Sequence, residues 1–269
     1  MMDKLNTLLA AFALGLVASG AALASGGLDL RLEPAPVNRL DAESLQRGAR
    51  TFVNYCLNCH SAKYMRYNRL TDLGIDISMI EDNLMFATDK SGETMTVAMT
   101  AKDAKAWFGA PPPDLSVESR VRGADWLYNY FLAFYRDEST PSGWNNLVFP
   151  NVAMPHVLWA QGGVNKLLST EYKSHDEALA AAIAVKGLTA VAPGKGHAYV
   201  VETLALDTPG ALTTTQYKAM VADLVNFLDY MAEPSKNRRI NLGLIVLLYL
   251  GVLFVFVYWM KREYWKDIH

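Results

Sequence analysis

Residues 56–60 read Cys56-Leu57-Asn58-Cys59-His60, and both cysteines of the 269-residue chain lie within these five positions. The spacing is C-x-x-C-H, the attachment signature of c-type haem. Residues three apart share one face of a helical turn, so both thiols can add to the two vinyl groups of one porphyrin. The adjacent imidazole of His60 then serves as the proximal iron ligand. The motif predicts one covalently attached haem c, held by Cys56, Cys59 and His60.

Two other kinds of site use a Cys-x-x-Cys pair. A redox-active dithiol of the thioredoxin type would have a βαβ pattern beside it, and a zinc site would need two more thiol or imidazole ligands at short spacing. Neither pattern is visible around Cys56 and Cys59. We therefore prefer haem attachment to both alternatives.

A helix is predicted directly before the motif. Asp41 is a candidate N-cap, and Leu45, Ala49, Phe52 and Cys56 recur at helical spacing. Further helices are predicted at 101–107 after the cap Thr100, at 125–135, at 175–185 after the cap Ser174, and at 213–231. Few strands are expected, so the fold class is mainly α.

The distal ligand decides what the iron can do, because an open position binds small molecules whereas a His/Met pair only passes electrons. Met154 lies between Pro150 and Pro155, and the following proline keeps it out of helical geometry. Such a rigid loop can hold a thioether at the iron. His156 is its rival and would give bis-His ligation. His175 and His197 are interpreted as ordinary polar histidines.

Both ends of the chain carry long uncharged segments. No charge occurs between Lys4 and Asp29, and Ala22-Leu23-Ala24 fits an A-x-A cleavage site. We interpret residues 1–24 as a signal peptide for bacterial export, with an uncleaved membrane helix as the alternative. The first 30 residues contain no arginine, which argues against a mitochondrial transit peptide.

The second segment, LGLIVLLYLGVLFVFVYWM, covers residues 242–260 without a charge. As a helix it spans roughly 28 Å, close to the ~30 Å hydrocarbon core of a bilayer, which favours a transmembrane helix over a buried core helix. Three basic residues flank each side, so orientation rests on the export signal. We expect an outer domain at 25–235, a linker at 236–241 and a cytoplasmic tail at 261–269.

The charge balance excludes a nucleic-acid-binding chain. Lys and Arg total 25 against 27 Asp and Glu, and only 19% of residues are charged. The predicted outer domain holds 18 basic and 24 acidic residues, so it is acidic by about six charges. Such a surface attracts a basic partner rather than a polyanion.

The order of motifs resembles the cytochrome c1 family, the haem subunits of the ubiquinol–cytochrome c reductase (bc1) complex. The matching stretches, in chain order, are Cys56–His60, Ala110-Pro111-Pro112-Pro113-Asp114-Leu115-Ser116, Arg122-Gly123-Ala124-Asp125-Trp126, Phe149-Pro150-Asn151-Val152-Ala153-Met154-Pro155, and Glu233-Pro234 before an anchor ending Lys261-Arg262-x-x-Trp265. Residues 167–201 have no confident counterpart, and their role is left open.

The resemblance implies a class I c-type cytochrome fold with insertions, whose first and last helices cross near the haem, plus one C-terminal transmembrane helix. It implies that Met154 is the distal ligand and that the Pro111–Pro113 loop lies against the haem. It also implies that Arg122 pairs with a haem propionate, with Arg120 as a close rival.

For function, the resemblance implies an electron-transfer subunit that is not an enzyme on its own. It would sit in the bacterial inner membrane with its haem domain in the periplasm, beside cytochrome b and a Rieske iron–sulfur protein. Single electrons would pass from the Rieske protein to a soluble c-type cytochrome. The alternatives are the haem subunit of another exported dehydrogenase or oxidase, and a haem peroxidase or sensor with an open iron site.

Overall fold

The helix before the haem motif, α2 (Ala42–Thr51), begins at Asp41, whose side chain accepts the Ser44 amide at 3.0 Å. This computed structural model describes residues 29–194, 196 and 198–266, so the predicted signal segment 1–24 lies outside it. Leu45 and Ala49 are buried as the spacing predicted. The helix then widens into one π-helical turn, η1 (Phe52–Cys56), which ends on the first cysteine. Turns of this kind often occur at functional sites.

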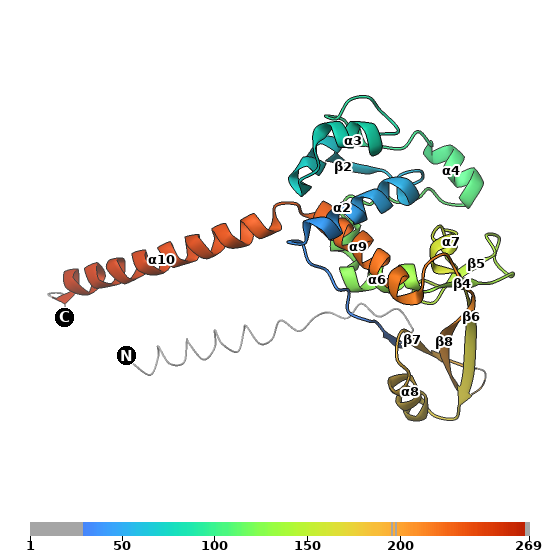
Figure 1. Ribbon diagram of the computed structural model, residues 1–269. Helices are drawn as coiled ribbons and strands as arrows, with labels where there is room; N and C mark the ends of the chain where they lie inside the picture. Colours follow the sequence, from blue (N-terminus) through green and yellow to red (C-terminus); the bar gives the residue numbers. More distant parts are fainter. Residues whose placement is uncertain (1–28, 195, 197, 267–269) are drawn as a thin grey trace.

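α9 (Thr214–Ala232) crosses α2 at the centre of the domain (Figure 1). The crossing is close because Gly48 has no side chain: a Cβ there would overlap the Asp223 carbonyl oxygen and the Phe227 Cβ. The Phe52 and Phe227 rings meet beside it, with centroids 5.6 Å apart. The first and last helices of the domain therefore cross, as the resemblance implied.

α6 (Ala124–Leu132) packs against α9 and is shorter than predicted. The helix expected to reach residue 135 ends at Leu132, and β4 (Phe134–Arg136) follows, paired antiparallel with β5 (Trp144–Asn146). Phe134 is 1% exposed, so its burial in the core stabilises the strand against the helical periodicity of the sequence.

Short elements follow the haem motif along the chain, all but one of them before α6. The cap at Thr100 is confirmed, and Gly109, with φ 79°, ends the helix that begins there. In chain order the elements are β2 (Ala62–Arg66), η2 (Tyr67–Leu73), α3 (Ile77–Asn83), β3 (Thr94–Met95), α4 (Ala101–Phe108), α5 (Glu118–Arg122) and α7 (Trp159–Gly162).

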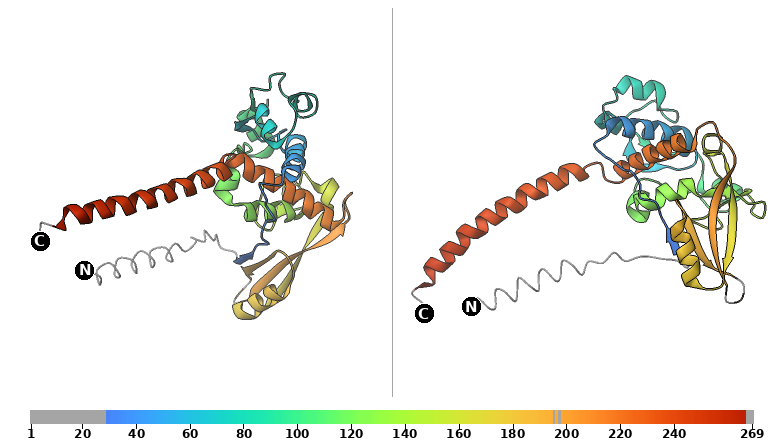
Figure 2. Two further views of the ribbon diagram at one scale, coloured as in Figure 1. Left: turned by 60° about the vertical axis from the view of Figure 1, so that its left-hand side comes forward. Right: turned by 60° about the horizontal axis from the view of Figure 1, so that its bottom comes forward.

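The expectation of few strands is wrong for the segment at 164–208. It forms β6 (Val164–Tyr172), α8 (His175–Ala184), β7 (Thr189–Pro193) and β8 (Tyr199–Thr208). With β1 (Asp29–Arg31) these strands make an antiparallel sheet of order β1-β7-β8-β6, seen at the lower right of Figure 1 and again in Figure 2. The strand β1 pairs with a segment about 160 residues further along the chain, so no local sequence pattern could predict this pairing.

The sheet is covered on both faces. Ala190 packs with Ala133, Leu147 and Val148 of the haem-motif domain, whereas Val191 and Val201 pack against α8 through Ala178 and Ala182. Residues 167–201, whose role was left open, thus form most of a β-sheet subdomain built onto the helical core.

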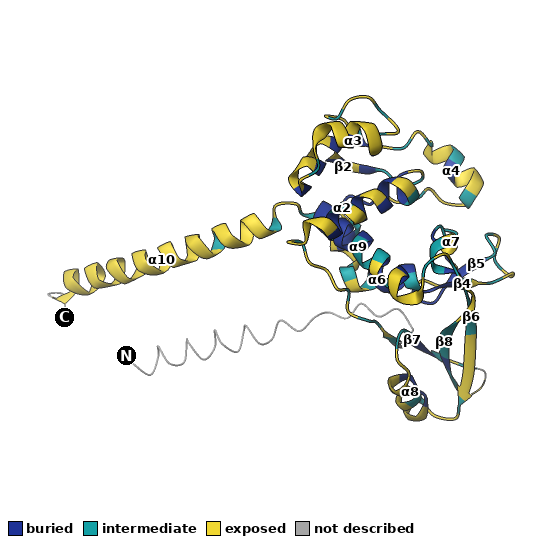
Figure 3. Ribbon diagram, in the orientation of Figure 1, coloured by how far each residue is buried: buried dark blue, intermediate teal, exposed yellow. Residues whose placement is uncertain are grey.

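α10 (Lys236–Tyr264) extends away from the domain as one continuous helix, exposed along almost its entire length (Figures 1 and 3). Among the residues that the structure describes, it is the helix long and apolar enough to cross a membrane, with a mean hydropathy of 2.7. Residues 236–241, expected as a linker, form its first turns, because that stretch contains no proline or glycine to interrupt a helix.

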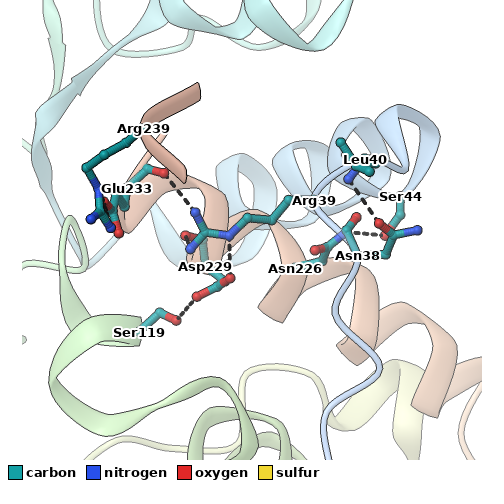
Figure 4. A network of polar contacts seen from close by, with 9 residues as sticks. All are labelled: Asn38, Arg39, Leu40, Ser44, Ser119, Asn226, Asp229, Glu233 and Arg239. Atoms are coloured by element: carbon teal, nitrogen blue, oxygen red, sulfur yellow. Dashed lines mark hydrogen bonds and ion pairs between the residues drawn. The ribbon is translucent and has the colours of Figure 1, made fainter. Parts of the chain in front are cut away.

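Polar contacts, most of them partly buried, tie the end of α9 to the N-terminal segment and to α5 (Figure 4). The Arg39 guanidinium lies 2.5 Å from the Asp229 carboxylate and donates to the Glu233 carbonyl at 2.8 Å. Ser119 of α5 donates to the other Asp229 oxygen at 2.9 Å. Arg239 of α10 pairs with the Glu233 side chain at 2.7 Å. These contacts fix the end of α9 within the domain, and the half-exposed pair between Arg239 and Glu233 adds a contact to the first turn of α10.

Candidate functional site

The two cysteines lie on one tight turn. Cys56 ends η1 and is buried, and the amides of Cys59 and His60 both donate to its carbonyl, at 3.1 and 2.9 Å. Both are free thiols. Burial raises the pKa of the Cys56 thiol to about 12. A redox dithiol needs a lowered thiol pKa, so this environment argues against a thioredoxin-like role.

His60 is held in one ring orientation. Its Nδ1 lies 2.8 Å from the carbonyl oxygen of Pro113, and because a carbonyl only accepts, Nδ1 carries the proton and donates. Nε2 is left with a free lone pair. Burial also lowers the pKa of His60, which favours the neutral ring. A neutral imidazole with its other nitrogen bonded to a backbone carbonyl is the usual state of a metal-binding histidine.

The proline loop is fastened to the chain just after the motif. Leu115 donates its amide to the Ser61 carbonyl at 2.9 Å, and the Asp114 carboxylate accepts the Lys63 amide at 2.9 Å. Asp114 also accepts the Ser116 amide at 2.9 Å, which closes the turn. These bonds place the Pro113 carbonyl against His60. Sequence reasoning expected the loop near the haem but did not identify this carbonyl as the partner of the ligand.

Met154 lies in a loop that two asparagines of β5 hold in place. The Asn146 side chain accepts the amides of Val148 and Phe149 at 2.9 and 3.1 Å, and the Asn145 side chain accepts the Asn151 amide at 2.8 Å. Sequence reasoning missed both asparagines. An Asn-Asn pair just before a proline-bounded loop is a turn-forming signal that could have pointed to them.

The sulfur of Met154 has a defined partner. Tyr130 of α6 donates its hydroxyl to Met154 Sδ at 3.4 Å. Met154 packs against the same buried cluster that contains Cys56, Leu115 and Tyr130. The loop and the haem motif therefore border one core.

His156, the rival ligand, lies inside an aromatic cluster. Its ring is stacked on Phe134 with centroids 4.9 Å apart and planes 6° apart, and the rings of Trp144 and Tyr217 meet it edge-on. The side chain is 3% exposed, and burial lowers its pKa to about 4. His175 lies edge-on to Tyr199 in the sheet subdomain, and His197 lies outside the described residues.

The arginines expected near a propionate lie on α5. The Arg122 guanidinium lies 4.8 Å from the Trp126 ring centroid and 5.6 Å from that of Phe149, and it pairs with Glu118 at 3.2 Å. Arg122 is thereby placed beside the Met154 loop, to which Phe149 belongs. Arg120 is exposed and lies two residues earlier on the same short helix.

This donor set fits a haem c. It offers two free thiols at the required spacing, an oriented imidazole and a thioether, the ligand pair of electron-transfer cytochromes. Among the described residues, three buried side-chain atoms have no hydrogen-bond partner, and one of them is the hydroxyl of Tyr67, which lies in the same buried cluster as Cys56. Across the described ranges, no cluster of three or more His, Cys, Asp or Glu side chains could hold a metal ion, so a zinc site finds no further ligands there.

Comparison with known proteins identifies the family. The sequence model of the cytochrome c1 family matches residues 33–177 and 210–268, which leaves 178–209 of the sheet subdomain unmatched. The chain is 43% identical to cytochrome c1 of Allochromatium vinosum over 94% of this chain and 96% of that protein. It is 44% identical to a protein of Nitrosomonas europaea named ammonia monooxygenase gamma subunit, over 91% and 92%. Cytochrome c1 of Rhodospirillum rubrum is 27% identical over 86% and 84%. The chain belongs to the cytochrome c1 family, whose members are haem-bearing electron-transfer subunits of the bc1 complex and not enzymes on their own.

Proposed function

We propose that this chain carries one haem c, attached through Cys56 and Cys59, and passes single electrons from a Rieske iron–sulfur protein to a soluble c-type cytochrome. His60 and Met154 are the axial ligands in this proposal. When bound, the haem supplies the one-electron ferric/ferrous couple. The observation that carries the proposal is the 2.8 Å contact between His60 Nδ1 and the Pro113 carbonyl, because it leaves Nε2 to bind the iron.

Met154 is a better distal ligand than His156 on the contacts of each side chain. To reach the iron, His156 would have to leave its stack on Phe134 and open the aromatic cluster. Met154 lies in a pinned loop at the border of the core and keeps a lone pair on sulfur beyond the one that Tyr130 uses. Ligation by Met154 closes the iron to substrates, so it supports electron transfer over peroxidase or sensor chemistry.

The proposal extends to one propionate contact. Arg122 is rigidly placed by two aromatic rings beside the Met154 loop, and its ion pair with Glu118 is half-exposed and therefore weak. A propionate can replace or share that partner. Arg120 remains the alternative on the same helix.

The membrane arrangement follows from the two ends of the chain. In the proposal, residues 1–24 direct export and are removed, residues 25–235 lie in the periplasm, and residues 242–260 within α10 cross the bacterial inner membrane. Residues 261–269 are then cytoplasmic. Alkaline phosphatase fused after residue 235 should be active, and the same reporter fused after residue 266 should be inactive. The reverse pattern would overturn this orientation.

The proteins with which the chain assembles distinguish the proposed function from its main alternative, the haem subunit of another exported enzyme. The relative named ammonia monooxygenase gamma subunit gives a specific reason to keep the haem subunit of another exported enzyme as a second candidate. The acidic balance of the outer domain, 18 basic against 24 acidic residues, suits a basic soluble acceptor in either case.

A pull-down from detergent-solubilised membranes tests the proposal. The full chain, tagged at its C-terminus, should bring with it a multi-span cytochrome b and a Rieske protein, found by haem difference spectra and mass identification. Recovery with monooxygenase or dehydrogenase subunits would favour the alternative. Rapid binding of carbon monoxide by the reduced chain would overturn the closed iron site.

A further inference from the structure

The hydrogen bond from Tyr130 to the sulfur of Met154 has no role in the function proposed so far. The hydroxyl oxygen lies 3.4 Å from Met154 Sδ, within the range of a bond to sulfur. Tyr130 is 8% exposed, so no bulk water competes for its hydroxyl. A thioether sulfur is a weak hydrogen-bond acceptor.

The phenol ring is held in place from three sides. Trp126 stacks on it with centroids 5.0 Å apart and planes 12° apart, and the rings of Phe131 and Phe134 meet it edge-on at 5.5 and 5.1 Å. Aromatic pairs of this kind fix ring orientation as well as adding stability. The packing therefore fixes the position of the hydroxyl oxygen, which lies 3.4 Å from the Met154 sulfur.

The side chain of Asn146 also fixes the position of Tyr130 relative to the Met154 loop. Its side-chain nitrogen donates to the Tyr130 carbonyl at 2.8 Å, and its side-chain oxygen accepts the amides of Val148 and Phe149 at the start of the Met154 loop. One side chain thus joins the helix that carries the donor to the loop that carries the acceptor.

We propose that Tyr130 is a positioning residue that orients Met154 and raises the reduction potential of the haem. The inference rests on the proposed function, because it takes Met154 as the distal ligand. The sulfur has two lone pairs, one for iron and one for the Tyr130 hydroxyl. A hydrogen bond withdraws electron density from the sulfur and weakens its donation to ferric iron, so the ferrous state is favoured.

The test is Tyr130→Phe in the full chain, because it removes one oxygen and keeps the ring that Trp126 stacks on. We expect a lower reduction potential, with the ferric-to-ferrous ratio at a fixed poise raised about five-fold, the size of one net hydrogen bond. The sulfur-to-iron charge-transfer band of the ferric protein should shift or weaken.

Tyr217→Phe is the matched control. Its hydroxyl is buried too and donates to the Phe131 carbonyl at 3.0 Å rather than to sulfur. We expect a comparable loss of stability and an unchanged potential. Equal shifts of potential in the two variants would mean that any buried hydroxyl matters, and would overturn the inference.

The unsubstituted protein gives a second measurement that needs no variant. If Tyr130 donates to the ligand sulfur, the iron–sulfur stretching band in the Raman spectrum should move when the protein is transferred to D2O. An unmoved band, or an unchanged potential in Tyr130→Phe, would overturn the role of Tyr130 while Met154 stays the ligand. Absence of any sulfur-to-iron band in the unsubstituted protein would instead refute Met154 ligation, and with it the proposed function.

Discussion

Replacing Gly48 by alanine should destabilise the domain that carries the haem motif, because two helices cross at that residue. An added Cβ would overlap the Asp223 carbonyl oxygen and the Phe227 Cβ, and the first of these is backbone that no rotamer change can move. Overpacking of this kind costs about 3 kcal/mol when α2 and α9 must separate. Alanine returns about 1 kcal/mol through its higher helix propensity. The net prediction is a loss of about 2 kcal/mol of unfolding free energy.

Urea unfolding of the full chain in detergent, followed by circular dichroism, measures this loss. With a slope of about 2 kcal/mol per molar urea, the midpoint should fall by roughly 1 M. Gly92→Ala is the control, because nothing lies within 4 Å of a Cβ placed there. A Gly48→Ala protein that unfolds at the same urea concentration as the control would refute the close crossing of α2 and α9.

Three further outcomes are expected. Met154→Leu should keep haem covalently bound but lower its reduction potential sharply, since a thioether favours ferrous iron; redox titration checks this, and an unchanged value would point to another ligand. Cys56→Ser combined with Cys59→Ser should leave no haem-bearing band on a denaturing gel, and a persisting band would contradict covalent attachment at this motif. Although burial raises the pKa of Asp229, its hydrogen bond and ion pair with Arg39 lower the pKa overall, so stability from this carboxylate is present at neutral pH and lost as the pH falls below about 4. Asp229→Asn should therefore cost roughly 3 kcal/mol at pH 7 and flatten the acid limb of the stability profile; an unaltered acid limb would assign it to other groups.

Local patterns in the sequence were enough for the haem motif and for most helix starts. Asp41, Thr100 and Ser174 each cap the helix that was predicted to follow. Thr213, predicted as the first residue of a helix, is instead its N-cap. A capping side chain bonds a backbone amide two or three residues further on, so the signal and the helix it starts lie within the same short stretch of sequence. The apolar stretch 242–260 likewise lies within the single helix α10.

Helical spacing of apolar residues gave a wrong prediction where contacts with distant segments determined the structure. The aromatic stripe that continues α6 beyond Leu132 becomes β4, because Phe134 gains a buried place against His156 and a partner strand in β5. The sheet of β1, β6, β7 and β8 needs a strand from the opposite end of the domain. The partner strands, β5 for β4 and β1 for β7, lie outside the stretch of residues over which helical periodicity is read.

The amino-acid sequence determined which groups could bind a haem, because the C-x-x-C-H motif consists of five consecutive residues and its spacing is set by the chain itself. Only the tertiary structure decided how those groups are aimed. The orientation of His60 comes from Pro113, 53 residues away, and the donor to Met154 comes from Tyr130, 24 residues away on another element. Both contacts form only when the folded core brings distant segments together. The same packing encloses the imidazole of His156, which could also bind iron, among aromatic rings.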